Sequence, residues 1–278
     1  MTTDRRAREG MSMERERRLS DLVDYIVERG SVRLEEVLER FDVSPATARR
    51  DLDALADQQL VTRTRGGAIA NGSSGDVPLR YRTVRQGRQK GAISLAVADS
   101  IEPGSVIAFN GGTTTTMAAY EVGVRSSADE ALSHAPLTVV TNAINIANDL
   151  IVRPQLRVVV LGGAARMRSY ELIGPLASLI LPAISIDTLY LGVSAIDLDR
   201  GLFTHDEGEA AVNAALVEAA RRVVVVADST KLASTAFARI CGFDAVDALI
   251  TDDGLSDTDA ARLTQLGLDV TRAGTAPS

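Results

Sequence analysis

The stretch "FNGGTTTTMA", residues 109–118, places two glycines and four consecutive threonines directly after a short apolar run. A glycine turn between a strand and a helix leaves backbone N–H groups unobstructed, and neighbouring hydroxyls add donors, so such a turn can bind an anion. The stretch matches neither the Gly-x4-Gly-Lys spacing of a P-loop nor the Gly-x-Gly-x-x-Gly of a dinucleotide site. The pattern therefore favours a monophosphate ligand, although a tight turn with threonine caps and no ligand is an alternative. The candidate residues are Asn110, Gly111, Gly112, Thr113, Thr114 and Thr115.

Positive charge for such a ligand has to come from elsewhere in the chain, because the turn contains no lysine. The chain has only two lysines, and Lys231 follows the apolar run "VVVVAD", so we expect it to be the main cation, with Lys90 second. Ligands of open α/β sheets gather at the carboxyl ends of the strands. The other residues expected at that edge are Asn110, Thr141, Gly162 and Asp228.

A second candidate site lies in "DVSPATARRDLDALADQQL", residues 42–60. Ser44 followed by proline is typical of a helix N-cap and first helical residue. Arg50 projects from the side of this helix opposite to its apolar residues, which recur at helical spacing. Those apolar residues are Ala48, Leu52 and Leu55.

The exposed side of that helix has the chemistry of a DNA reader. The planar fork of an arginine can bond N7 and O6 of guanine together, and threonine can contact a phosphate or a base edge. The next segment, "VTRTRGGAI", alternates up to a Gly66-Gly67 turn and predicts a β-wing whose arginines meet phosphates or the minor groove. The alternative is an amphipathic helix with solvated arginines. The candidate DNA-binding residues are Ser44, Thr47, Arg49, Arg50, Arg63 and Arg65.

Composition limits the class of protein. The 278 residues are 45% hydrophobic and carry a net charge of −7, and residues 61–90 have seven basic residues against Asp76 alone, a local +6. An acidic body with a basic segment can still meet phosphates locally. Cys241 is the only cysteine, so no intramolecular disulfide can form. No signal peptide or membrane span is evident, so we expect a cytoplasmic protein.

The chain divides into four parts by pattern. Residues 1–13 are polar and predict a disordered tail, and residues 14–69 predict three helices and a wing. The segment "ANGSSGD", residues 70–76, has the composition of a linker. In residues 77–278, β-branched runs such as "SVIAF" and "RRVVVVAD" alternate with helical stretches, which predicts a mostly parallel sheet covered on both faces.

"SPATARRDLDALADQQLVTRTRGGAI" resembles the DeoR-type (GlpR-like) family of bacterial transcriptional regulators, whose recognition helix carries Ser-x-x-Thr-x-Arg-Arg-Asp-Leu. The chain departs from the family at Ala48, where a larger aliphatic residue is more common. The resemblance implies a winged helix-turn-helix followed by an α/β sensor domain similar to sugar-phosphate isomerases and coenzyme A transferases.

The resemblance continues through ordered motifs of the sensor domain, from "QKGAIS" to "ADSTK". Asn110 stands where the family usually has aspartate, and Asn213 where it commonly has a basic residue, so the effector preference can differ from that of the family. A helix cap at Thr141 and Asn142, and positions merely near helix ends for Glu209 and Asp228, are alternatives to ligand contact. The motifs carry over, as effector-binding candidates, Lys90, Gly112, Thr113, Thr114, Thr141, Asn142, Gly162, Gly163, Glu209, Asp228 and Lys231.

Together these patterns predict a homodimeric or homotetrameric repressor of a carbohydrate-metabolism operon. Its partners would be operator DNA and a phosphorylated sugar or related metabolite, with no membrane, cofactor or metal. The main alternative is a sugar-phosphate isomerase or deaminase with an appended DNA module, since Glu209, Asp228 and Lys231 could do acid–base work. An architectural DNA-binding protein with a silent second domain is a third.

Overall fold

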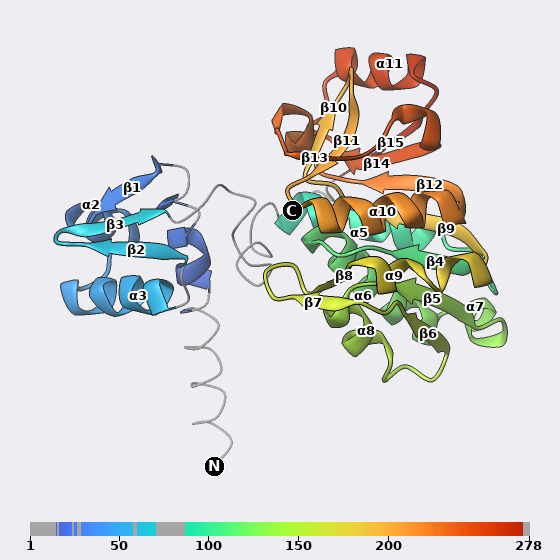
Figure 1. The fold of residues 1–278 in the computed structure, drawn as a ribbon, viewed down its shortest axis with the longest axis horizontal. Coiled ribbons are helices and arrows are strands. Elements are labelled where there is room, and N and C mark those ends of the chain that lie inside the picture. Colours follow the sequence, from blue (N-terminus) through green and yellow to red (C-terminus); the bar gives the residue numbers. More distant parts are fainter. Residues whose placement is uncertain are drawn as a thin grey trace. The chain divides into compact units, whose positions relative to one another are not determined.

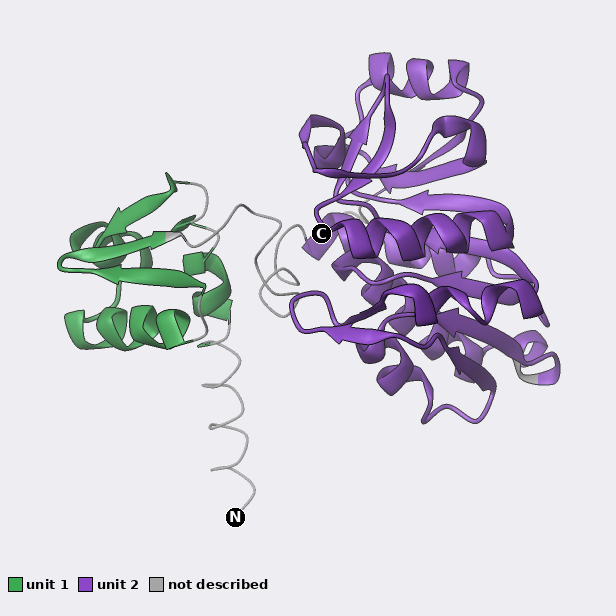
Figure 2. Cartoon of the chain, viewed as in Figure 1, with its two compact units in different colours: residues 1–85 green, residues 86–278 purple. Residues whose placement is uncertain are grey.

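The computed structural model describes residues 15, 17–23, 25–26, 29–57, 60–70 and 87–274. The chain forms two compact units, residues 1–85 and 86–278 (Figure 2). The predicted tail, residues 1–13, and nearly all of the predicted linker lie outside the described residues.

The first unit is a helix-turn-helix with a wing (Figure 1). Helical residues within 15–29 precede β1 (Ser31–Arg33), α2 (Leu34–Phe41), α3 (Pro45–Asp57), β2 (Val61–Thr64) and β3 (Gly67–Ala70). The three strands form an antiparallel sheet in the order β1-β3-β2. Its core is made of Leu19, Leu22, Val23, Ile26, Val32, Val37, Ala48, Leu52, Leu55, Leu60, Val61 and Ala68.

The wing turn lies one residue earlier than the sequence predicts. Thr64 pairs with Gly67, so the two turn residues are Arg65 and Gly66, and Gly67 belongs to β3. Gly67 is needed there because β1 passes very close, and a Cβ on it would lie 1.9 Å from the carbonyl oxygen of Val32. The second glycine therefore serves the packing of the sheet, and the turn places Arg65 at its tip.

The second unit contains a seven-stranded, fully parallel sheet in the order β15-β14-β12-β9-β4-β5-β6. The strands are β4 (Val106–Phe109), β5 (Leu137–Thr141), β6 (Leu156–Val160), β9 (Ile186–Leu191), β12 (Ala220–Val226), β14 (Ala248–Asp252) and β15 (Asp269–Ala273). The β-branched runs of the sequence form this sheet, as predicted.

Helices cover both faces of the sheet, which explains why its strands are apolar on both sides. In β12, Val223 and Val225 pack in one core cluster, whereas Val224 and Val226 pack in the other. The helices of the second cluster are α5 (Gly87–Asp99), α6 (Thr113–Ala128) and α8 (Ile144–Leu150), with α7 (Glu130–His134) following α6. The opposite cluster includes residues of α9 (Pro175–Ser178), α10 (Glu207–Ala219) and α11 (Asp257–Gln265).

Two smaller sheets extend this layer structure. The hairpin of β7 (Ala164–Arg166) and β8 (Glu171–Ile173) follows β6. A second antiparallel sheet has the order β10-β11-β13, from β10 (Ala195–Asp197), β11 (Gly201–Thr204) and β13 (Ala238–Cys241). Among the helices of the described ranges, none is long and apolar enough to cross a membrane.

Candidate functional site

The N-terminus of α3 is fixed by the serine and threonine that the sequence singles out. The Ser44 hydroxyl oxygen accepts from the Thr47 backbone N–H at 3.2 Å and shares a 2.9 Å hydrogen bond with the Thr47 hydroxyl. Both side chains are therefore engaged with each other in capping the helix. This pair fixes the start of α3. The contact of Ser44 and Thr47 with DNA stays a prediction.

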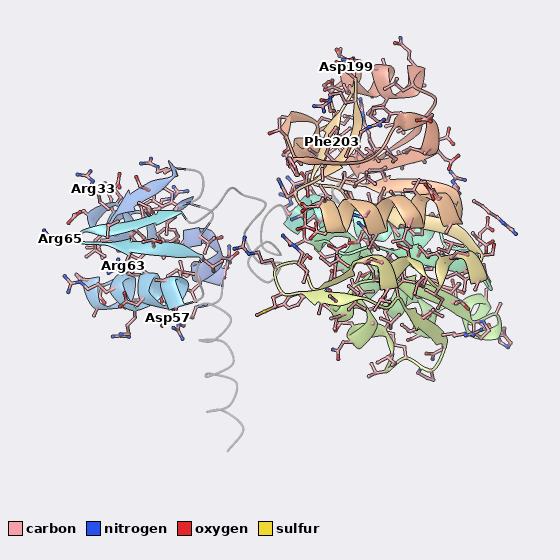
Figure 3. The ribbon with its side chains drawn as sticks, in the orientation of Figure 1. Arg33, Asp57, Arg63, Arg65, Asp199 and Phe203 are labelled. Carbon is pink, nitrogen blue, oxygen red and sulfur yellow. The ribbon has the colours of Figure 1, made fainter. Side chains whose placement is uncertain are left out.

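Arg49 and Arg50 lie on the exposed side of α3, opposite the buried Ala48 and Leu52. Neither guanidinium has an ion pair or hydrogen bond with any residue that the structure describes. Arg65 is also exposed, at the end of the wing (Figure 3). Three arginine side chains of this unit are thus presented to solvent, as a phosphate or base contact requires.

Arg63 differs from these three. Its Nε donates to Asp53 Oδ1 on α3 at 2.8 Å, and its Nη1 donates to the carbonyl oxygen of Gly67 on β3 at 2.5 Å. The side chain is half-buried and joins the wing to the recognition helix (Figure 3). In this structure its donors join the wing to α3, and its contact with DNA stays a prediction.

Asp51 is buried on α3, on the same side as the apolar Ala48, Leu52 and Leu55. Its Oδ2 accepts from Arg18 Nε at 2.7 Å, and its Oδ1 lies 3.8 Å from Arg15 Nε. Both arginines belong to the first helical segment. The aspartate of the recognition-helix motif therefore anchors α3 on that segment and does not face outward.

In the second unit the carboxyl ends of the parallel strands bring the predicted polar loops to one edge of the sheet. Asn110, directly after β4, is 2% exposed. Its Nδ2 donates to the Gly192 carbonyl at 2.9 Å, and its Oδ1 accepts from the Gly192 N–H at 2.7 Å. Asn110 therefore joins the ends of β4 and β9. Both of its polar atoms thus have a backbone partner, and the contact of this amide with the ligand stays a prediction.

The threonines of the glycine turn divide into two pairs. The hydroxyls of Thr115 and Thr116 donate to the Gly112 carbonyl, at 3.1 and 2.6 Å, and so are bonded to the backbone at the start of α6. The hydroxyls of Thr113 and Thr114 have no hydrogen bond to any part of the chain that the structure describes. Gly112 has φ 140° and ψ 163° and offers no side-chain cap, so the first amides of α6 lack that partner.

Thr141 and Asn142 make local and cross-strand contacts at the end of β5. The Thr141 hydroxyl accepts from the Ala143 N–H at 3.0 Å, which supports the capping alternative for this residue. Asn142 is fully buried, and its Nδ2 donates to Glu171 Oε1 and to the Leu172 carbonyl, both at 3.3 Å. Its Oδ1 has no hydrogen-bond partner among the described residues.

Glu171 is the functional candidate that sequence reasoning missed. It opens β8, is 3% exposed, and accepts the Gly111 N–H at 3.0 Å. Burial, and then the charge of Glu209, raise the pKa of the Glu171 carboxyl to about 8. A buried carboxyl thus lies directly against the glycine turn and is neutral at pH 7.

Glu209, a predicted site residue, belongs to the same cluster. Its Oε1 accepts from Arg166 Nη1 at 3.0 Å, and its Oε2 accepts from the Thr204 hydroxyl at 2.9 Å. Arg166 Nε also donates to Asp206 Oδ2 at 3.1 Å, and Asp206 caps α10 by accepting the Glu209 N–H. Arg166 therefore neutralises charge for two carboxylates at once, from the β7–β8 hairpin.

Gly162 and Gly163 pack against α9 and the end of β8, respectively. A Cβ on Gly162 would lie 3.2 Å from the Leu176 carbonyl oxygen, and one on Gly163, whose φ is 126°, would lie 2.6 Å from that of Ile173. These close approaches account for both glycines as packing positions. Asn213 is 2% exposed on α10, and its Oδ1 has no partner among the described residues.

The "ADSTK" segment follows β12 at the same edge of the sheet. Asp228 is buried and accepts a hydrogen bond from the Thr230 hydroxyl. Ser229 donates to Asp252 through its N–H at 2.7 Å and through its hydroxyl at 3.0 Å. Lys231 is half-buried on the 3₁₀ turn that follows Asp228.

Lys90, the second predicted cation, is 4% exposed near the start of α5. Its carbonyl accepts from the Ser94 hydroxyl at 2.7 Å. The pairing of either lysine with a bound phosphate stays a prediction.

Comparison with known proteins decides the family. A model of the DeoR C terminal sensor domain matches residues 85–253, and one of the DeoR-like helix-turn-helix domain matches residues 18–74. The chain belongs to the DeoR family of transcriptional regulators. The predicted family, the DNA-binding module and the sensor domain are thereby confirmed.

Several curated relatives of this DeoR-family regulator are repressors. The Glycerol-3-phosphate regulon repressor of Escherichia coli K12 is 34% identical over 240 residues, covering 86% of this chain and 92% of that protein. The HTH-type transcriptional repressor CsqR of the same strain is 36% identical over 236 residues, covering 85% and 87%. Among solved structures, ribose 5-phosphate isomerase A from Methanocaldococcus jannaschii gives a TM-score of 0.38 at 15% identity, covering 51% of this chain and 53% of that one.

Proposed function

We propose that this DeoR-family regulator is a cytoplasmic repressor of a carbohydrate-metabolism operon. Its α3 helix and wing would bind operator DNA, and its sensor domain would bind a phosphorylated sugar or related metabolite that changes operator affinity. Two copies of the chain would read paired half-sites, since one recognition helix covers only a few base pairs. Effector control requires that the metabolite bind the DNA-competent and DNA-incompetent states with different affinities.

The observation that carries the effector proposal is the start of α6. Gly112 leaves the first amides of this 16-residue helix without a side-chain cap. The hydroxyls of Thr113 and Thr114 beside them are uncommitted within the described part of the chain. Such amides and hydroxyls suit the oxygens of a phosphate group, which the positive end of the helix also attracts.

The test joins ligand binding to DNA binding in the intact chain. Genomic fragments that the protein retains would first be selected and narrowed to an operator by footprinting. Thermal unfolding would then be followed with a panel of sugar phosphates, each paired with its dephosphorylated sugar. We expect a phosphorylated compound to raise the unfolding temperature and to alter the operator gel shift, while its sugar does neither.

Lys231→Ala is the matched variant, because it removes a predicted effector contact from the sensor unit and leaves α3 unchanged. It should weaken the response to the phosphorylated compound and spare operator binding. Loss of operator binding in Lys231→Ala would contradict this division of labour. A panel in which no phosphorylated compound stabilises the protein would refute the effector class.

An isomerase-like enzyme is the second candidate, favoured by the neutral, buried carboxyl of Glu171 beside Glu209. Carboxyls with a raised pKa can exchange protons with a substrate near neutral pH. Incubation with each compound that binds, followed by analysis of the products, separates the two functions. Turnover would support the enzyme, and unchanged ligand would support the switch.

A further inference from the structure

The chain places one of its own acids on the glycine turn that is the candidate anion site. Glu171 Oε1 accepts from the Gly111 N–H at 3.0 Å and from Asn142 Nδ2 at 3.3 Å, which joins the loops after β4 and β5. The fit is tight, because a Cβ on Gly111 would lie 2.2 Å from Glu171 Cγ. Two groups expected to meet a ligand therefore meet a carboxyl oxygen.

The surroundings of this carboxyl are rich in acid. Glu209 of α10 is an acidic neighbour, which adds to the effect of burial in raising the pKa of the Glu171 carboxyl. Arg166 of β7 donates a hydrogen bond to Glu209 and a second one to Asp206, which lies just before α10. Arg166 thus pairs with Asp206 and Glu209, and among the described residues it makes no hydrogen bond or ion pair with Glu171.

We propose that Glu171 is a specificity-determining residue of the effector site: as a neutral acid it admits an anionic ligand to the glycine-threonine turn, and as a carboxylate it excludes one. This role rests on the proposed function, since it concerns the ligand of that same site. A phosphate held by the amides of Thr113 and Thr114 lies within a few residues of Gly111, where a second negative charge repels it in a poorly solvated site.

The protonation state of Glu171 makes this selection depend on pH. Burial and the charge of Glu209 hold the pKa of its carboxyl at about 8, so the neutral form prevails at pH 7 and the carboxylate at pH 9. A site that binds only in the neutral form is then about 90% competent at pH 7 and about 10% competent at pH 9. Affinity for an anion should fall by about tenfold over this range.

Calorimetric titration of the full chain with glycerol 3-phosphate at pH 7, 8 and 9 tests the inference. This probe is mainly dianionic throughout, because the second pKa of a phosphomonoester is about 6. Wild type should lose about tenfold in affinity, whereas Glu171→Gln, which keeps a neutral side chain of the same shape, should change by less than about twofold. Glu207→Gln, exposed at the start of α10, should keep the wild-type profile.

Equal pH dependence in wild type and Glu171→Gln would overturn the role of Glu171 and leave the proposed function intact. Absence of binding by wild type at pH 7 to every phosphorylated compound would refute the proposed function itself. Infrared spectroscopy of the wild-type protein checks the same point without a variant. A protonated carboxyl band should be present at pH 7 and lost by pH 9, and its absence at pH 7 would also overturn the inference.

Discussion

The two units of the chain use polar residues in opposite ways. In the DNA-binding unit, Arg49, Arg50 and Arg65 are exposed and bond to no described residue. In the sensor unit, Asn110 and Glu209 are buried, and their polar atoms are engaged with neighbouring strands and loops.

The difference follows from the ligands. DNA is larger than the unit that reads it, so the reading side chains have to project from a small apolar core. A small metabolite has to be enclosed, so its site is built from groups that are first held in place by one another. Single substitutions should therefore act on binding in the first unit, and on both stability and binding in the second.

The largest effect is expected for Arg50→Ala. Loss of a bidentate base contact in each of two half-sites, at about 1–3 kcal/mol per contact, should weaken specific operator binding by roughly 10²-fold or more. Binding to unrelated DNA should change far less. Gel shifts with operator and scrambled duplexes measure both, with Arg157→Ala, exposed on β6, as control. An unchanged operator affinity would remove the exposed side of α3 from the reading surface.

Asp51→Ala is an exception within the first unit, because this acid is buried and bonded to Arg18. Removing a charged hydrogen bond of this kind should lower the free energy of unfolding of that unit by about 1.5–3 kcal/mol. Differential scanning calorimetry should show the loss in one transition, with the sensor unit unaffected. Asp53→Ala, at an exposed acid on the same helix, should cost less, and an equal cost would contradict the anchoring role of Asp51.

Most of the first unit could be predicted from sequence, because the residues that determine its helices and its wing lie close together in the chain. The serine and proline that open α3, and Ala48, Leu52 and Leu55 on its buried side, lie within one helix, where spacing alone fixes direction. The parallel sheet was equally accessible, since continuous β-branched runs such as Val223–Val226 are typical of strands covered on both faces.

The sensor site could be predicted only in part. Asn110 was found by its place after a strand, but its bond to Gly192 joins residues 82 apart and depends on the strand order β9-β4. Glu171 was missed because it stands in an irregular stretch, "RMRSYELIGP", without periodicity. Its contact with Gly111 spans 60 residues, and only the folded hairpin brings them together. A glycine at position 111 indicates that another group packs closely against it, but the sequence does not show which group this is.

Asn110→Ala tests whether a buried polar residue of the sensor unit contributes to the stability of that unit as well as to ligand binding. The change would leave the N–H and the carbonyl of Gly192 without their partner, at an expected cost of about 1–2 kcal/mol in the free energy of unfolding of the sensor unit, even without ligand. Chemical denaturation of the unliganded protein measures this cost. Unchanged stability together with altered ligand preference would instead support a direct contact of Asn110 with the effector.

The smallest effect is expected for Arg65→Ala, compared with Arg63→Ala on the same hairpin. Because Arg65 is exposed at the wing tip, its loss should weaken operator and scrambled DNA alike by a few-fold. The slope of log affinity against log salt should become shallower by about 1 for each lost phosphate contact. Unfolding should be unchanged.

Arg63→Ala should lower the free energy of unfolding of the first unit by about 0.5–1 kcal/mol, since it removes the links to Asp53 and Gly67. Arg63→Ala would then weaken DNA binding by displacing the wing and not by removing a phosphate contact. The slope of log affinity against log salt should therefore stay near that of wild type. If Arg63→Ala instead reduces the slope as much as Arg65→Ala does, Arg63 leaves its intramolecular partners for phosphate on binding. Both arginines would then contact phosphate. The distinction between exposed arginines that bind DNA and hydrogen-bonded residues that stabilise the unit would not hold within the wing.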